Sequence, residues 1–236
     1  MGTLFLVATP IGNFQDISLR QAEILYNADL IACEDTRRTG MLLKFIHDTF
    51  FAHEPIRKVP LLSYYEQNEQ FRIPQILNAL QNNVHVCLVS DAGVPLVSDP
   101  GYKLVRTVIA QGIRVEAIPG PSAVLTALVV SGLPTDKFMF VGYPPHKPGH
   151  RQKLFENIQK SQEIIKSTVI LYEAPHKLKQ TLQEMHAVLG DITIVIAREL
   201  TKVHEEVLRG TISEMITHFE KTIPKGECTL LLYFGN

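Results

Sequence analysis

The chain has 236 residues, of which 45% are hydrophobic, and its formal net charge is −1. This length suffices for one large domain or two small ones, and the near-neutral charge excludes binding of nucleic acid through a global basic field alone. No apolar run reaches the roughly 18 residues of a membrane span, and the N-terminus lacks the basic region of a signal peptide. The three cysteines, Cys33, Cys87 and Cys228, lie in or beside apolar runs. We therefore expect a cytoplasmic protein with buried, reduced thiols.

Short apolar runs alternate with amphipathic segments through the first half of the chain. We expect strands at 4–8, 30–32, 59–62, 84–89 and 113–118, and helices at 19–25, 36–46, 69–82 and 102–109. Ser18 is predicted to cap the first of these helices, and Asp99, followed by Pro100, the last. The alternation is typical of βαβ units around a mostly parallel sheet.

A cluster of turn residues, 119–121, interrupts this pattern and predicts a domain boundary. We therefore expect an N-terminal α/β lobe over 1–118 and a C-terminal α/β lobe over 119–236. In the second lobe we expect strands at 138–141, 168–172, 193–197, 205–209 and 229–234, and helices at 123–131, after 149, at 175–189 and at 212–219. The second lobe should hold a mixed sheet.

The loop 90–101 is the most constrained segment of the chain. Gly93 and Gly101 permit positive φ angles, while two prolines fix φ elsewhere. It follows a predicted buried strand, and ligands bind at the carboxyl ends of parallel strands. Its two carboxylates, Asp91 and Asp99, with little positive charge beside them, favour a ligand with hydroxyls, amines or a cation over a phosphate.

Three further loops of the first half also follow predicted strands. The segment 8–18 lacks the GxGxxG pattern of dinucleotide sites, and an ordinary turn explains it equally well. In 33–40, Arg37 and Arg38 could bind phosphates of RNA, or the adjacent acids and arginines could pair with one another. In 63–69, aromatic and amide side chains could contact a base, or the segment could lead into a helix cap.

Two loops of the second half carry polar residues at predicted strand ends, 171–177 and 197–202. Arg198 beside Glu199 is compatible with a simple local ion pair. His146 and His150 are four residues apart, but a proline and a glycine lie between them, which argues against a shared helical face and a metal site. We therefore expect no metal.

The order of these motifs is more specific than any one of them. The chain contains, in this order, TPIGNFQDIS, CEDTRRTG, SYYEQNE, SDAGVPLVSDPG, PGPSA, LYEAPHKL and ARELTK. This series closely resembles the ribosomal RNA small subunit methyltransferase I family of the tetrapyrrole (corrin/porphyrin) methylase superfamily. The resemblance implies two α/β lobes of the class III methyltransferase type with S-adenosylmethionine (SAM) in the cleft between them. It also implies a homodimer that methylates the ribose 2′-hydroxyl of a cytidine in small-subunit (16S) ribosomal RNA.

The resemblance also assigns residues. The implied cofactor site contains Pro10, Asp91, Ala92, Gly93, Val94, Ser122, Ala123, Leu171, Tyr172, Ala197, Cys228 and Thr229. The implied RNA side contains Arg37, Arg38, Lys44, Lys147 and Arg151. SAM carries an ammonium and a sulfonium, which suit the Asp91 carboxylate and an aromatic face such as that of Tyr172.

A base or cation near the weakly acidic ribose hydroxyl would assist the transfer. The candidates, unranked, are Glu34, Asp35, Glu66, Arg198 and Lys202. Position 65 is Tyr where members of the family commonly carry His, so Tyr65 is not a candidate base. Two alternatives stay open: a methyltransferase of the same fold that acts on a small molecule such as a tetrapyrrole, and a non-catalytic module that binds SAM or RNA.

Overall fold

The computed structural model describes residues 1–235. The chain divides into two compact units, Met1–Ser122 and a second that begins at Ala123. The sequence predicted a boundary after residue 118, which is the last residue of the fifth strand. In the structure, residues 119–122 belong to the first unit, so the boundary lies four residues later.

The first unit is built on a five-stranded sheet whose strands all run parallel. Its strands are β1 (Thr3–Val7), β2 (Leu30–Cys33), β3 (Leu61–Ser63), β4 (Val86–Val89) and β5 (Arg114–Ile118), in the order β3-β2-β4-β1-β5. The expected parallel sheet is confirmed.

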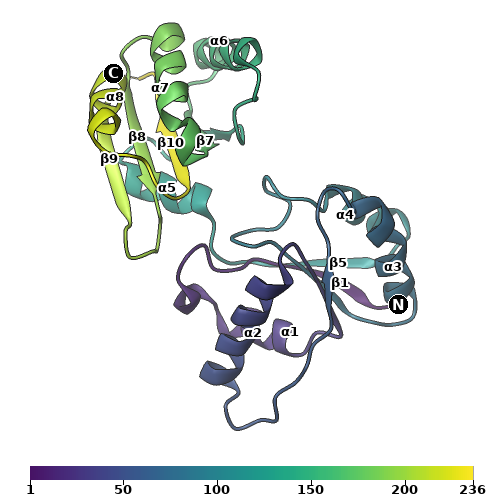
Figure 1. The fold of residues 1–236 in the computed structure, drawn as a ribbon. Helices are drawn as coiled ribbons and strands as arrows, with labels where there is room; N and C mark the ends of the chain where they lie inside the picture. Colours follow the sequence, from purple (N-terminus) through teal and green to yellow (C-terminus); the bar gives the residue numbers. More distant parts are fainter. Residues whose placement is uncertain (236) are drawn as a thin grey trace. The chain divides into compact units, whose positions relative to one another are not determined.

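Helices cover both faces of this sheet (Figure 1). They are α1 (Leu19–Tyr26), α2 (Thr36–Phe50), α3 (Glu69–Gln81) and α4 (Tyr102–Ala110), with a short 3-10 helix at Phe14–Asp16. Side chains alternate along β1: Phe5 and Val7 pack with α1 and α2, whereas Leu4 and Leu6 pack with α3 and α4. The predicted cap of α1 is confirmed, because Ser18 and Gln21 form a capping box.

The predicted cap of α4 is wrong. The helix begins after Gly101, which has φ +130°, and not after Asp99. A Cβ at position 101 would lie 2.8 Å from the side chain of Leu88, so the close packing of this turn on β4 requires glycine. The Asp-Pro signal is local, and tertiary packing overrides it here.

The strand order changes direction at the carboxyl ends of β1 and β4. These strands are neighbours, but the chain leaves β1 for α1 on one face and leaves β4 for α4 on the other. Such a topological switch point is where open α/β sheets bind ligands. The loops 8–18 and 90–101 therefore start at the position where a ligand is expected.

The second unit contains a mixed sheet, as expected. Its strands are β6 (Phe138–Phe140), β7 (Thr168–Glu173), β8 (Thr193–Arg198), β9 (Glu206–Thr211) and β10 (Cys228–Leu232), in the order β6-β7-β10-β8-β9. Only β6 and β7 pair in parallel among these; β10 pairs antiparallel with β7 and β8, and β8 with β9.

Three helices pack over one face of the second sheet and form its core: α6 (Pro148–Ile164), α7 (Pro175–Leu189) and α8 (Ile212–Lys221). The helix α5 (Ala123–Ser131) contacts β8, β9 and β10 and contributes no residue to that core, so it covers the other face (Figure 1). None of the helices within residues 1–235 is long and apolar enough to cross a membrane.

Candidate functional site

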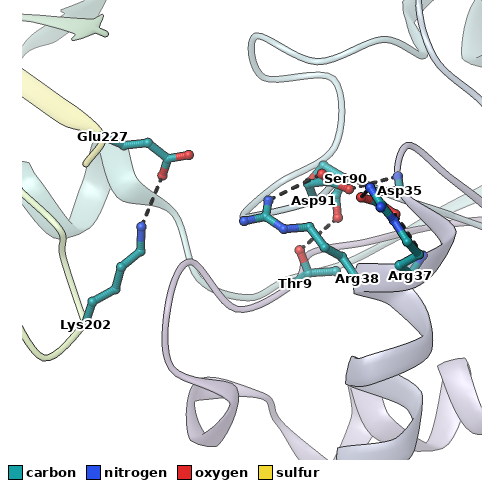
Figure 2. A network of polar contacts seen from close by, with 8 residues as sticks. All are labelled: Thr9, Asp35, Arg37, Arg38, Ser90, Asp91, Lys202 and Glu227. Carbon is teal, nitrogen blue, oxygen red and sulfur yellow. Dashed lines mark hydrogen bonds and ion pairs between the residues drawn. The ribbon is translucent and has the colours of Figure 1, made fainter. Parts of the chain in front are cut away.

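Asp91 joins the loops that follow β4 and β2. Its Oδ1 accepts a hydrogen bond from the backbone N–H of Asp35 at 3.0 Å, and its Oδ2 lies 3.3 Å from Nη1 of Arg38 (Figure 2). The side chain keeps 26% of its surface exposed. This carboxylate is thus held in a fixed orientation at the edge of the sheet while one part of it stays accessible.

The loop after β1 is joined to the same segment. Thr9 and Gly93 form an antiparallel bridge, with N···O distances of 2.8 and 3.0 Å, and the Thr9 hydroxyl donates to the carbonyl of Ser90 at 3.1 Å. Gly93 has φ +89°, a conformation that side chains disfavour. Around this bridge Pro10 and Gly93 are buried, Ala92 is half-buried and Val94 is exposed.

Glu34 carries the most perturbed carboxyl of this edge. It is half-buried in the turn between β2 and α2. Burial, then the negative charges of Asp99 and Asp91, raise its pKa to about 7, while Arg38 acts to lower it. The negative charge of this edge therefore exceeds the positive charge that faces Glu34, and such an edge attracts a cation.

Asp35 has a different role from its neighbour. It caps α2 by accepting from the backbone N–H of Arg37 at 2.8 Å, and it also accepts from the Arg37 guanidinium at 2.9 and 3.1 Å. These bonds to Arg37 lower the pKa of Asp35 to about 2. Asp35 is ionised at neutral pH and engaged, so it is a poor proton acceptor.

The other candidates of the first unit lie further along the chain. Glu66 is exposed, and Lys44 pairs with Asp48 at 2.6 Å on the surface of α2. Ser122 and Ala123 are half-buried where the two units of the chain join. The sequence pattern did not single out Glu69, a buried carboxylate at the start of α3, because an acid in a first helical turn is an ordinary residue there.

In the second unit, register brings three predicted cofactor residues together. Thr229 of β10 lies opposite Tyr172 of β7 on one side and opposite Ala197 of β8 on the other. Tyr172 also packs edge-on against Phe140, with ring centroids 4.8 Å apart. Neighbouring residues of paired strands point to the same face, so these three form one continuous patch, in which Tyr172 is half-buried and Ala197 and Thr229 are buried.

Leu171 and Cys228 do not belong to that patch. Both are buried in the core beneath α6, α7 and α8, and burial raises the pKa of the Cys228 thiol to about 12. Because strand residues alternate between faces, their side chains point away from the face of Tyr172. Only their backbone atoms could contact a ligand on that face.

Arg198 ends β8, and Lys202 lies in the turn that follows. Arg198 donates through Nε to Glu206, and Lys202 contacts Glu199 at 2.9 Å. Glu199 and Thr201 adopt positive φ angles of 50° and 64°, which is a strained conformation for a β-branched residue such as Thr. Both candidate cations are thus held by carboxylates, Arg198 at the end of β8 and Lys202 in a strained turn.

Arg151 and Lys147 differ in accessibility although both were assigned to RNA. Lys147 is exposed before α6. Arg151 is only 4% exposed and contacts Glu184 through Nε and Nη2, at 2.6 and 2.5 Å. This burial argues against a direct contact of Arg151 with a phosphate. Within residues 1–235, no group of three or more His, Cys, Asp or Glu side chains could hold a metal ion.

Comparison with known proteins identifies the family. The family model described as Tetrapyrrole (Corrin/Porphyrin) Methylases matches residues 3–216. A protein of Thermotoga maritima named ribosomal RNA small subunit methyltransferase I is 44% identical over 98% of each chain. A protein of the same name from Halalkalibacterium halodurans is 43% identical over 98% of this chain and 75% of its own.

Two solved structures share the fold at low identity. Cobalt precorrin-4 methyltransferase aligns with a TM-score of 0.70 at 15% identity, covering 97% of this chain and 94% of its own. Diphthine synthase aligns with a TM-score of 0.70 at 14% identity, covering 98% and 90%. These likenesses confirm the α/β fold. The sequence matches are much closer, and they show that the chain belongs to the ribosomal RNA small subunit methyltransferase I family within the tetrapyrrole methylases.

Proposed function

We propose that the protein transfers a methyl group from SAM to the ribose 2′-hydroxyl of a cytidine in small-subunit (16S) ribosomal RNA. The observation that carries this proposal is the 44% identity to a ribosomal RNA small subunit methyltransferase I over 98% of both chains. Homologues of the same fold carry names with quite different acceptors, such as a cobalt precorrin. The fold alone therefore supports methyl transfer but not the acceptor.

The charge at the switch point fits SAM. SAM, when bound, supplies a methyl carbon on a positively charged sulfur, and it also carries an ammonium group. Burial is the largest cause of the raised pKa of Glu34, and the charges of Asp99 and Asp91 raise it further than Arg38 lowers it. A cation placed there lowers the electrostatic energy of all three carboxylates.

We assign the cofactor contacts by their position in each unit. In the first unit they are Pro10, the segment 91–94, Ser122 and Ala123, which lie on or near the loops at the switch point. In the second unit they are Tyr172, Ala197 and Thr229, which form the continuous patch. Leu171 and Cys228 would contribute through backbone atoms only.

Glu34 is the best candidate to accept the proton of the ribose hydroxyl. SAM, when bound, would supply the methyl group, and the Glu34 carboxylate would accept the proton that the ribose hydroxyl loses. A base with a pKa near the working pH is the most efficient, and the pKa of Glu34 is about 7. Asp35 caps α2, whereas Arg198 and Lys202 each contact a carboxylate.

The proposed RNA contacts are the accessible cations. Arg37 keeps 88% of its side chain exposed although it contacts Asp35, and Lys44 is 78% exposed. Arg38 and Lys147 are also exposed. Such side chains bind phosphates without reading sequence, so they would orient the RNA and not select the cytidine.

Methyl transfer to defined acceptors tests the proposal. The purified protein is incubated with labelled SAM and, in separate reactions, with small ribosomal subunits from a strain lacking the gene, with naked 16S ribosomal RNA and with a porphyrinoid. We expect label in a 2′-O-methylated cytidine when nucleosides of the ribosomal RNA are analysed. Label in the porphyrinoid alone would support the small-molecule alternative, and SAM binding without transfer to any acceptor would support the non-catalytic one.

A further inference from the structure

The segment 63–69 is a polar loop to which the proposed function gives no role. It follows β3 at the carboxyl edge of the parallel sheet, the edge at which the loops after β1, β2 and β4 also begin. The sequence allowed two interpretations of it, contact with a base or entry into a helix cap. In the structure its side chains divide into some that hold the loop and some that are exposed.

Tyr64 and Asn68 hold the loop. Tyr64 is only 1% exposed, and its hydroxyl donates to Glu69 at 2.7 Å. Asn68 accepts through Oδ1 from the N–H of Tyr65 at 2.9 Å and donates through Nδ2 to the carbonyl of Ser63 at 3.0 Å. These two side chains are engaged within the protein, so they fit the structural interpretation and not contact with a base.

The partner of Tyr64 is itself firmly held. Glu69 lies in the first turn of α3, and its side chain is only 5% exposed. Besides the Tyr64 hydroxyl, it accepts from the N–H of Gly101 at 3.2 Å and lies 3.0 Å from Nζ of Lys103. Ionised side chains are seldom buried unless specific partners compensate them. The loop after β3 is therefore tied to the start of α4.

Tyr65 is presented by this fixed loop. Both of its backbone polar groups are bonded to Asn68, since its C=O also accepts from the Asn68 N–H at 3.0 Å. The residue is 41% exposed, and among residues 1–235 its hydroxyl has no hydrogen-bond partner and its ring no ring contact. Single exposed aromatic residues are common. An aromatic ring on a loop that is already ordered, however, loses little entropy when it binds a ligand.

Tyr65 lies beside the segment that carries Glu34. The strands β2 and β3 pair in parallel up to Cys33 and Ser63, and the bond from the Tyr64 N–H to the Cys33 carbonyl, at 2.8 Å, extends the pairing by one residue. Glu34 directly follows Cys33, and Tyr65 directly follows Tyr64. The two residues therefore leave neighbouring strands at the same edge of the sheet, immediately beyond their last hydrogen bond.

This edge offers a partner for each part of a nucleotide. Glu34 is the proposed acceptor of the ribose proton, and the exposed Arg37 and Arg38 are proposed phosphate contacts. The remaining part is the base. Unstacked RNA bases pack on aromatic side chains, and Tyr65 is the exposed aromatic residue of the loop next to Glu34.

We propose that Tyr65 is a substrate-binding residue whose ring stacks on the base of the nucleotide that is methylated and thereby places its ribose hydroxyl at Glu34. The inference rests on the proposed function, in which the acceptor is a ribose of RNA. Stacking is tolerant of sequence, because every base has a π face. Tyr65 would thus select a nucleotide whose base is unstacked, as in single-stranded RNA, without distinguishing cytosine from other bases.

A tryptophan at position 65 reports this contact directly. The chain contains no Trp, so Tyr65→Trp introduces a single fluorophore whose emission a stacked base quenches. Phe50→Trp is the matched control: Phe50 is 37% exposed and ends the 15-residue helix α2, about 20 Å along the helix from the carboxyl edge. Each protein is titrated at low salt with single-stranded oligocytidylate of about eight nucleotides and with an abasic oligomer of the same length.

We expect oligocytidylate to cause a saturable loss of fluorescence in Tyr65→Trp and none in Phe50→Trp, whereas the abasic oligomer should quench neither. The inference would be overturned by an unquenched Tyr65→Trp, by equal quenching of both variants, or by quenching that the abasic oligomer reproduces. The titration needs no methyl transfer. A wild type that methylates no ribosomal RNA would therefore overturn the proposed function separately, even where Tyr65→Trp is quenched.

Two further variants test what the contact does for the reaction. Tyr65→Leu removes the aromatic face, so kcat/KM on small ribosomal subunits should fall by about 5- to 100-fold, the range for one stacked base, whereas Tyr65→Phe keeps the face and should stay within about twofold of wild type. The thermal midpoint and SAM affinity should not change in either variant, since the side chain is exposed. Equal losses in both variants would assign the effect to the hydroxyl and overturn stacking.

Discussion

The carboxyl edge of the first sheet and the second unit differ in how their charged side chains are compensated. At the first edge, burial and the charges of Asp99 and Asp91 act on Glu34 more strongly than Arg38 does. In the second unit, Arg198 is bonded to Glu206 and Arg151 to Glu184. Strain does not distinguish the two, because residues with positive φ occur in both. The charge around Glu34 does, and it is the reason why the proposed proton transfer is assigned to the first unit.

Among these variants, Glu34→Gln should have the largest effect on activity. A small effect would contradict the contrast drawn between the two units. We expect kcat to fall by about 100- to 10,000-fold, the usual contribution of a general base, with SAM binding retained. The measurement is single-turnover methyl transfer to small ribosomal subunits across pH 5 to 9. Wild-type activity in this variant would remove Glu34 from the mechanism and return the other candidates to consideration.

The same variant should be more stable than wild type at alkaline pH. The pKa of Glu34 is raised from 4.5 to about 7 in the folded protein, so the folded state binds its proton more tightly and wild-type stability falls as pH rises from 4.5 through 7. Glutamine avoids this loss, so its advantage should grow from near zero at pH 4.5 to about 3 kcal/mol at pH 8. Urea unfolding at both pH values measures it, and a constant difference would contradict the raised pKa of Glu34.

Arg151→Ala tests whether a paired charge of the second unit stabilises the fold and does not bind RNA. Because it leaves Glu184 without the partner of a largely buried ion pair, we expect the free energy of unfolding to fall by about 3 kcal/mol. RNA affinity of the folded protein should not change. Filter binding at low temperature, with exposed Lys147→Ala as the matched variant, separates the two roles. A selective loss of RNA binding in Arg151→Ala would restore it to the RNA surface.

Asp91→Ala tests whether the negative charge of the first unit contributes to cofactor binding. Loss of the carboxylate frees the Asp35 N–H and Arg38 and removes negative charge from the switch point, so SAM binding should weaken by about 100-fold. Calorimetry with SAM measures this, and circular dichroism confirms the fold. Glu206→Gln in the second unit is the matched control, with an expected change below about threefold. Normal SAM binding by Asp91→Ala would move the cofactor site elsewhere.

Arg37→Ala should have the smallest effect of these changes. Its guanidinium is exposed and contacts Asp35, so its removal should leave SAM binding intact. RNA affinity should fall by about fivefold, and the slope of log affinity against log salt should decrease by about one contact. Equilibrium binding at several salt concentrations measures both. An unchanged slope would mean that Arg37 serves only its bond with Asp35.

Much of the fold was predictable because its signals are local. The helices 123–131 and 175–189 were predicted with the bounds that the structure has, since a proline lies at or just before each start and a glycine follows each last residue. The start of α4 was not, because the Asp-Pro signal at 99–100 is also local, whereas the start of this helix depends on the packing of Gly101 against Leu88. The 3-10 helix at Phe14–Asp16 is too short to leave a periodic pattern.

By itself, the sequence determined the family, the alternation of strands and helices, the parallel and mixed sheets and the set of loops that carry polar side chains. These features are predictable because local propensity and motif spacing depend only on the order of residues along the chain. Only the tertiary structure separated Tyr172 from Leu171, buried Arg151 against Glu184 and connected Glu69 to Gly101. Such distinctions depend on which face a side chain takes and which charges meet across the fold, and no single segment of the chain contains that information.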